Sequence, residues 1–167
     1  MNEKRFNGEP DRLRSPERRA RLETGKVIDY SLCGPVISSV LDVGTGTGLF
    51  AEEFATRELK VKGVDCNSEY LKIAAQMVPN VVFKQAVAEI LPFDNGSFDL
   101  VFMGHVLHEA DDPQKAVNEA YRVCRKRLAV LEWPCREQEM GPPADHRMPT
   151  QEIKEPVSYT HLRAHET

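Results

Sequence analysis

The order of apolar and polar positions predicts alternating strands and helices over the middle of the chain. Short apolar runs predict five strands, over residues 40–43, 59–64, 81–83, 98–103 and 128–133. Between them, helical spacing of apolar residues predicts helices over 49–57, 68–77 and 113–124. Strands that are apolar on both faces and alternate with helices are typical of a parallel sheet covered by helices. We therefore expect an α/β fold with a doubly wound, mostly parallel sheet.

The segment before the first strand, residues 1–35, has a different pattern. Its first 26 residues are polar and mildly basic. Ser15 followed by Pro16 is a helix-start signal, because serine caps a helix and proline fits its first turn. A helix is expected over residues 16–32. The basic residues Arg18, Arg19 and Arg21 could bind an anion, but such a run is more typical of a solvated helix face.

The end of the chain carries no apolar periodicity. Residues 134–156 are polar and proline-rich, which predicts a long loop and the start of a helix near residue 150. The last eleven residues, VSYTHLRAHET at 157–167, match the translation of a transposase-type sequencing adapter. We therefore expect a non-native tail there and a natural sequence that is interrupted near residue 156.

Composition and charge exclude several classes of function. With 22 Lys and Arg against 26 Asp and Glu, the net charge of −4 lacks the basic field of a general nucleic-acid-binding protein. No run of 18 apolar residues is present to span a membrane, and the N-terminus lacks the apolar core of a signal peptide. The four cysteines match no zinc or disulfide framework. A cytoplasmic protein with reduced thiols is expected, and the sequence leaves its oligomeric state open.

A glycine-rich turn follows the first predicted strand. Gly44, Gly46 and Gly48 form a G-x-G-x-G pattern that leads into a helix. Glycines permit a sharp turn and the close approach of backbone N–H groups to a ligand, which the helix N-terminus favours if it is negative. Asp65 ends the second strand, 21 residues after Gly44, where a carboxylate suits a ribose diol.

Two ligand classes fit this layout. A nicotinamide dinucleotide fingerprint is G-x-G-x-x-G/A, whereas Leu49 stands at its last position here and the third glycine comes one residue earlier. The spacing disfavours a dinucleotide and suits S-adenosylmethionine, which has a carboxylate but no pyrophosphate.

The blocks VLDVGTGTGLF, VKGVD and AEILPFDNGSFDLVFMGHVLHE, in this order, resemble the class I S-adenosylmethionine-dependent methyltransferases. The similarity is greatest to the small-molecule type that includes the quinone-biosynthesis enzymes. It covers residues 36–133, with a weaker GPPADHR stretch beyond. It implies a Rossmann-like sheet of seven strands in the order 3-2-1-4-5-7-6, of which this chain would lack the last two, and a cofactor crevice between strands one and four.

The resemblance also implies roles for single residues. The glycine loop would lie under the methionine part of the cofactor. Asp42 would hold its amino end, directly or through water, or would cap the loop instead. Asp65 would bind both ribose hydroxyls and Cys66 would pack on the adenine edge. The remaining positions carried over as cofactor-binding are Thr45, Ala88, Glu89 and His105.

One position departs from the family pattern. Many relatives have Asp in a G-D-A-E-x-L-P-F block, where this chain has Val87, so the adenine contact would fall to the backbone near Ala88. His108 follows the fourth strand and is the candidate general base, although a packing role at the helix entry fits its position too. The His and acidic residues at 105–112 do not form a zinc pattern, so no metal site is expected.

The resemblance therefore implies methyl transfer from S-adenosylmethionine to a small-molecule acceptor that the sequence does not identify. A non-catalytic or regulatory module that binds S-adenosylmethionine stays open as an alternative, and an NAD-dependent oxidoreductase fits less well. Macromolecular methylation is a further alternative. Many nucleic-acid amino-methyltransferases carry an Asn/Asp-Pro-Pro-Tyr block after strand four, where this chain has Met103-Gly104-His105-Val106.

Overall fold

A parallel sheet forms the centre of the protein in the computed structural model, which describes residues 4–6, 8–136 and 139–154. Its five strands have the order β3-β2-β1-β4-β5, and all neighbouring strands are parallel. They are β1 (Ser39–Val43), β2 (Lys60–Asp65), β3 (Val82–Gln85), β4 (Phe98–Gly104) and β5 (Cys124–Leu131). The α/β fold expected from the sequence is confirmed, and so is the order of the first five strands that the family resemblance implied.

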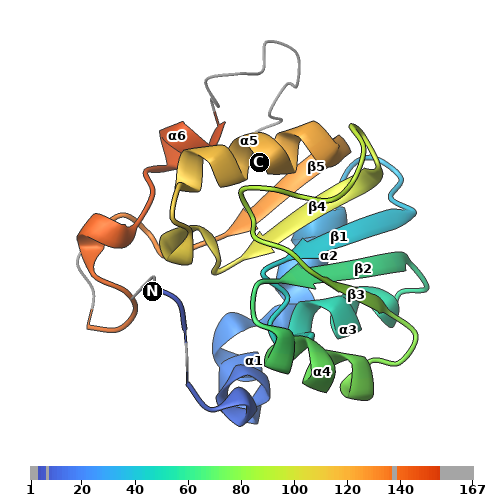
Figure 1. Cartoon of the computed structure of the whole chain (residues 1–167), viewed down its shortest axis with the longest axis horizontal. Helices are drawn as coiled ribbons and strands as arrows, with labels where there is room; N and C mark the ends of the chain where they lie inside the picture. Colours follow the sequence, from blue (N-terminus) through green and yellow to red (C-terminus); the bar gives the residue numbers. More distant parts are fainter. Residues whose placement is uncertain (1–3, 7, 137–138, 155–167) are drawn as a thin grey trace.

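Helices cover both faces of this sheet (Figure 1). They are α1 (Pro16–Leu22), α2 (Thr24–Leu32), α3 (Leu49–Ala55), α4 (Ser68–Met77), α5 (Pro113–Val123) and α6 (Thr150–Lys154). Three short 3-10 helices are η1 (Pro10–Arg14), η2 (Leu107–Glu109) and η3 (Ala144–His146). Among the described helices, none combines the length and the apolar character that a membrane crossing requires.

The sheet separates two hydrophobic clusters, which is why its strands are apolar on both faces. One cluster packs α5 and α6 against Leu41, Val101 and Met103. The other packs α2 and α3 against strand residues of the opposite face, with Phe54 and Phe102 fully buried. Burial of each such aromatic side chain contributes about 1.5–3 kcal/mol to stability. The two clusters hold the strand ends in fixed positions, and the loops after these ends build the site described below.

The prediction of one continuous N-terminal helix over residues 16–32 is wrong in one respect. Ser15 does cap its start, because its hydroxyl accepts a hydrogen bond from the Arg18 N–H at 3.1 Å. The helix is nevertheless divided into α1 and α2 at Glu23, whose φ of 46° and ψ of 49° are left-handed. The break turns α2 onto the sheet, where Ile28 is buried.

The fifth strand also differs from the expectation of 128–133. It begins at Cys124, within the helix expected over 113–124, and ends at Leu131, so Trp133 lies outside it. The residues that follow Cys124 are charged, and their side chains make polar contacts along the edge of the sheet. Arg125 pairs with Asp99 at 2.9 Å, and the Lys126 ammonium donates to the Val36 carbonyl at 2.8 Å. The apolar pattern therefore failed to indicate where this strand begins, because its first residues are charged.

The expected domain boundaries at residues 35, 133 and 156 stay predictions. A loop does follow β5, and α6 begins at Thr150. The tail expected at 157–167 lies outside the described residues.

Replacing Glu23 by glycine is expected to stabilise the protein. A left-handed conformation costs a residue with a Cβ roughly 1–2 kcal/mol, a cost that glycine escapes. The Glu23–Lys26 ion pair that is lost is exposed and contributes little. Urea unfolding should show a gain of about 1 kcal/mol in the free energy of unfolding for Glu23→Gly. Glu23→Ala, which keeps the Cβ, is the control, and equal stability of both variants would contradict the explanation.

Candidate functional site

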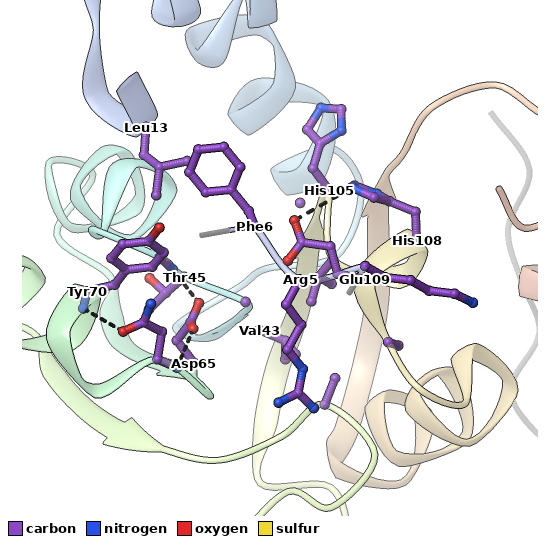
Figure 2. A pocket seen from close by; sticks show the side chains of 18 of the residues that line it. Arg5, Phe6, Leu13, Val43, Thr45, Asp65, Tyr70, His105, His108 and Glu109 are labelled. Atoms are coloured by element: carbon purple, nitrogen blue, oxygen red, sulfur yellow. Dashed lines mark hydrogen bonds and ion pairs between the residues drawn. The ribbon is translucent and has the colours of Figure 1, made fainter. Parts of the chain in front are cut away.

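A cavity of about 870 Å³ opens at the carboxyl ends of the central strands. This is the edge at which open parallel sheets bind ligands. Figure 2 shows Thr45, Asp65 and Tyr70 on one side and His105, His108 and Glu109 on the other. Arg5 and Phe6 of the N-terminal segment lie between the two sides. Residues from both halves of the sheet and from the N-terminal segment therefore share one cavity.

The glycine loop after β1 is fastened to the end of β2. The N–H groups of Gly44 and Thr45 both donate to the Val64 carbonyl at 2.9 Å, and the Gly46 N–H donates to an Asp65 carboxylate oxygen at 2.8 Å. Gly44 has a φ of +71°, and a Cβ there would lie 2.5 Å from a Val106 methyl group. Only glycine fits this position, so the loop has one path along the cavity wall.

Asp65 stands where the sequence predicted it, at the end of β2 and in the cavity wall. Its second carboxylate oxygen accepts the Asn67 N–H at 2.8 Å. Burial raises the pKa of Asp65 above its usual value, although the backbone N–H groups oppose that shift. Each oxygen keeps lone pairs for further donors. Cys66 lies beside it in the wall, and burial raises the pKa of its thiol.

Asp42 and Gly48 are not brought to the cavity wall, unlike the other cofactor-binding positions expected from the sequence. Asp42 is 1% exposed and accepts a hydrogen bond from the Thr45 hydroxyl at 2.7 Å. Burial raises its pKa to about 7, against the opposing hydrogen bonds from Thr45 and Ala51. Its position beneath the loop corresponds to the capping alternative. Gly48 is buried at the start of α3, against Ala74.

The segment between β3 and β4 supplies another part of the wall, through Val87, Ala88 and Glu89. Glu89 is 8% exposed, and one carboxylate oxygen accepts the N–H groups of Asp111 at 2.7 Å and Asp112 at 3.2 Å. Its carboxylate thus fastens the start of α5 to the cavity wall. Its burial is explained by these hydrogen bonds without a ligand.

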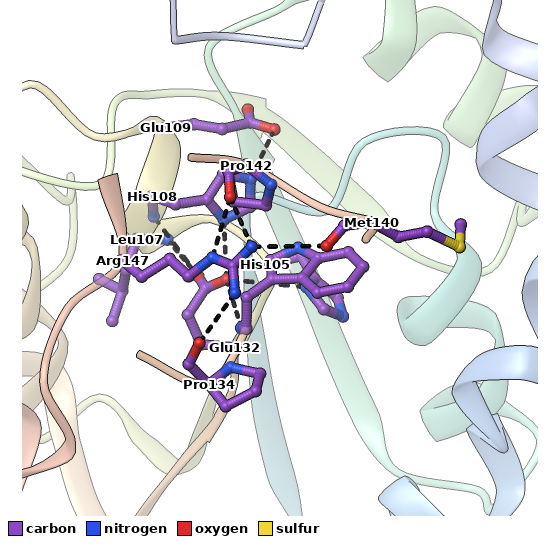
Figure 3. A network of polar contacts seen from close by, with 10 residues as sticks. His105, Leu107, His108, Glu109, Glu132, Pro134, Met140, Pro142 and Arg147 are labelled. Atoms are coloured by element: carbon purple, nitrogen blue, oxygen red, sulfur yellow. Dashed lines mark hydrogen bonds and ion pairs between the residues drawn. The ribbon is translucent and has the colours of Figure 1, made fainter. Parts of the chain in front are cut away.

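His108 is held by a carboxylate that sequence reasoning missed (Figure 3). Its Nδ1 lies 2.7 Å from a Glu132 oxygen, and the other Glu132 oxygen accepts the Leu107 N–H at 3.0 Å. Burial alone would raise the pKa of Glu132, but the His105 and His108 rings lower it to about 2. Glu132 therefore carries its charge at neutral pH and fixes the imidazole. The other ring nitrogen of His108, Nε2, lies 3.6 Å from Glu109.

His105 has unusual backbone and side-chain environments. Its φ of 55° is left-handed, and strained residues of this kind cluster at functional sites. Its ring lies 5.2 Å from the Trp133 ring. Its Nδ1 lies 3.7 Å from a Glu132 oxygen, and neither buried ring nitrogen makes a hydrogen bond in the described part of the chain. Buried polar atoms without hydrogen-bond partners cost free energy, so a polar ligand group in the cavity would lower that cost by forming a hydrogen bond with the ring.

Arg147 organises the segment that follows β5. It is 6% exposed, and its guanidinium donates to the main-chain carbonyls of Pro134, Met140 and Pro142, which Figure 3 shows. It donates to the Arg136 carbonyl as well. It also lies 5.9 Å from the Trp133 ring. Met140 and His146 of this segment line the cavity. In the sequence, the weak similarity of the GPPADHR stretch, which ends at Arg147, was the only signal that pointed to this segment.

Metal coordination is not indicated by the part of the chain that the structure describes. No group of three or more His, Cys, Asp or Glu residues there could hold a metal ion.

Comparison with known proteins shows the family to which the chain is similar. A model described as a methyltransferase domain matches residues 41–129, just over half of the chain. An uncharacterized methyltransferase, YcgJ, of Bacillus subtilis is 37% identical over 92 residues, which cover 52% of this chain and 36% of that protein. A demethylmenaquinone methyltransferase of Chlorobaculum tepidum is 38% identical over 106 residues, which cover 63% and 44%. The chain spans less than half the length of these two relatives.

A solved structure extends the likeness to the fold. A SAM-dependent methyltransferase from Aquifex aeolicus superposes with a TM-score of 0.74 at 25% identity, over 88% of this chain and 85% of that one.

The buried Asp42 predicts a pH dependence of stability. Its pKa is about 7 in the folded protein and near the ordinary 3.8 in the unfolded chain. Between these values the unfolded chain has lost the proton while the folded protein keeps it, so the free energy of unfolding falls as pH rises. The fall attributable to Asp42 is on the order of 2–4 kcal/mol.

Asp42→Asn cannot ionise and is expected to lack that part of the fall. Urea unfolding at pH 5 and pH 8 gives the free energy of unfolding of the variant and of the native protein, and the difference between the two proteins is compared at the two pH values. The variant should gain on the native protein as pH rises. A stability difference that is the same at both pH values would show that Asp42 does not titrate in this range.

Proposed function

The chain belongs to the class I S-adenosylmethionine-dependent methyltransferases, as its sequence resemblance implied, and we propose that it transfers a methyl group from S-adenosylmethionine to a small-molecule acceptor. The observation that carries this proposal is the joining of the glycine loop to the Asp65 carboxylate in the wall of one large cavity. The His108–Glu132 pair in the same cavity supports a catalytic role over binding alone, because binding needs no positioned base.

The residues present fit the cofactor. A Cβ at Gly44 would collide with the Val106 side chain, so glycine is required there and the loop keeps one path along the cavity wall. We assign the methionine part to this loop, with Thr45 and Gly46, and the ribose hydroxyls to the Asp65 carboxylate. Cys66 and Ala88 form the wall assigned to adenine. Asp42 supports the loop through Thr45, and Gly48 permits the packing of α3, so both act from behind the wall.

The mechanism follows from the donor and from what the cavity provides. The bound sulfonium supplies a methyl group that is already activated. The chain's own task is to align the acceptor with that methyl group and to exclude water, which supplies several kcal/mol of the barrier reduction. His108 Nε2 accepts the acceptor's proton, with the ring held by Glu132 at Nδ1. Glu132 is thus a positioning residue, and the buried His105 Nε2, which makes no hydrogen bond among the described residues, is available to a polar group of a ligand.

The name of one relative indicates an acceptor to test. The Chlorobaculum relative is named for demethylmenaquinone, so a reduced demethylmenaquinone is the first acceptor to test. The alternative of a non-catalytic S-adenosylmethionine-binding module predicts no methyl transfer to any acceptor. A cytoplasmic location stays a prediction.

Asp65→Ala is expected to weaken S-adenosylhomocysteine binding roughly tenfold to hundredfold, because charge-assisted hydrogen bonds to a ligand contribute about 1.5–3 kcal/mol. Calorimetric titration measures the affinity. Asp94→Ala removes an exposed carboxylate away from the cavity and should bind like the native protein. NAD is the comparison ligand, and saturable NAD binding in place of S-adenosylhomocysteine would overturn the proposal.

His108→Gln is expected to lower the rate of methyl transfer about 10²- to 10⁴-fold, the range typical of a lost general base. S-adenosylhomocysteine affinity should not change. The readout is single-turnover transfer of a labelled methyl group to reduced demethylmenaquinone across a pH series. Glu132→Gln should reduce the rate less and alter the pH profile. An undiminished rate in His108→Gln would remove the residue from the mechanism.

A further inference from the structure

Three backbone N–H groups of the glycine loop are already used within the protein. Those of Gly44 and Thr45 both donate to the Val64 carbonyl. That of Gly46 donates to the Asp65 carboxylate. The methionine part of S-adenosylmethionine, which is assigned to this loop, carries a carboxylate. A carboxylate at these N–H groups would compete with the acceptors that already hold them, so its charge requires a cationic side chain near the loop.

The N-terminal segment is held against this same loop. A Cβ at Gly46 would lie 3.3 Å from the Leu13 Cδ1 atom. Arg14 donates to the Thr47 carbonyl at 2.8 Å. Both contacts come from η1, and Ser15, which caps α1, follows directly. The first turn of α1 therefore begins beside the glycine loop, on the side of the cavity assigned to the cofactor.

Arg18 and Arg19 lie in that first turn and have different surroundings. Arg19 forms ion pairs with Glu52 at 2.5 Å and Glu53 at 2.9 Å, both on α3. Consecutive helical residues are turned by about 100°, so the Arg18 side chain points away from this pairing, and it lines the cavity. The sequence favoured a solvated helix face for this basic cluster. The structure corrects that interpretation for Arg18.

The charge of Arg18 is not compensated by an ion pair. Its Nε is buried without a hydrogen-bond partner, and its guanidinium forms no ion pair with any residue of 4–6, 8–136 and 139–154. Burial lowers the pKa of Arg18, nearby Arg21 lowers it further, and Glu109 opposes the shift. A partly buried cation without a partner costs free energy, and a ligand carboxylate would offset that cost.

The other arginines in the cavity wall fit this task less well. Arg5 is already paired with Asp111 at 3.1 Å. Arg12 and Arg21 are exposed, where water screens their attraction to an anion. Arg18 alone among these four combines a place in the wall with a buried, unpartnered nitrogen.

We propose that the Arg18 guanidinium binds the methionine carboxylate of S-adenosylmethionine. This inference rests on the proposed function and deepens it by adding a cofactor-binding residue from the N-terminal segment. The planar fork of arginine donates paired hydrogen bonds to a carboxylate, which fixes the orientation of the group as well as its position. The cofactor is then held at two points, its ribose by Asp65 and its carboxylate by Arg18.

Calorimetric titration of the full chain compares S-adenosylmethionine with decarboxylated S-adenosylmethionine, in which a hydrogen atom replaces the carboxylate. The native protein should bind S-adenosylmethionine about tenfold to hundredfold more tightly, because the decarboxylated compound cannot form the charge-assisted hydrogen bonds. Arg18→Gln should lose most of this ratio. It should weaken S-adenosylmethionine, while its affinity for the decarboxylated compound should not fall.

Two variants are controls for this ratio. Arg19→Gln makes the same change in the same helix outside the cavity and should keep the native ratio. Asp65→Ala should weaken both compounds alike, because they share the ribose, and should also keep the ratio. Arg18→Met removes the charge but keeps an apolar stem, and it replaces Arg18→Gln if circular dichroism shows that variant to be unfolded.

Four outcomes would overturn the inference. In three of them the proposed function stands: the native protein binds both compounds equally, Arg18→Gln keeps the native ratio, or Arg18→Gln weakens both compounds to the same extent. The third of these would show that Arg18 acts through the fold and not through the carboxylate. If the native protein binds neither compound, the proposed function fails and this inference with it.

Discussion

The hydrogen bonds between the end of β2 and the glycine loop are the constraint on which the site depends. Val64 and Asp65 accept three consecutive backbone N–H groups of the loop, and Asp42 receives the Thr45 hydroxyl from beneath. The loop is therefore shaped by the protein before any ligand arrives. An ordered wall reduces the entropy that a ligand would otherwise have to offset on binding.

A second carboxylate, Glu132, organises the opposite wall in the same manner. It joins the end of β5 to the loop after β4 by accepting the N–H groups of Leu107 and Trp133, and it fixes the His108 ring. Both walls thus consist of strand ends whose carboxylates hold neighbouring loops. The parallel register of the sheet brings these ends to one edge, and the two hydrophobic clusters hold the register.

The parallel sheet and the place of the site could be predicted, because apolar runs and the glycines of 44–48 are local signals, whereas the strand order was implied only by the family resemblance. The break between α1 and α2 at Glu23 could not be predicted, since glutamate has no preference for a left-handed conformation. Glu132 was missed because its partnership with His108 depends on the register of β5, which no local pattern fixes. The sequence also left open whether Asp42 contacts the cofactor or caps the loop, because that depends on which way its side chain faces in the packed sheet.

The hydrogen bonds of Arg147 have a consequence for which substitutions this protein can accept. All of its hydrogen-bond partners in the segment between residues 134 and 142 are main-chain carbonyls, which every amino acid possesses. The paths of residues 134–136 and 139–142 are therefore insensitive to most of their side chains, apart from Gly141 against Trp133. Substitutions there, for example at Met140, can change the shape and polarity of the cavity wall while the glycine loop on the other side stays in place.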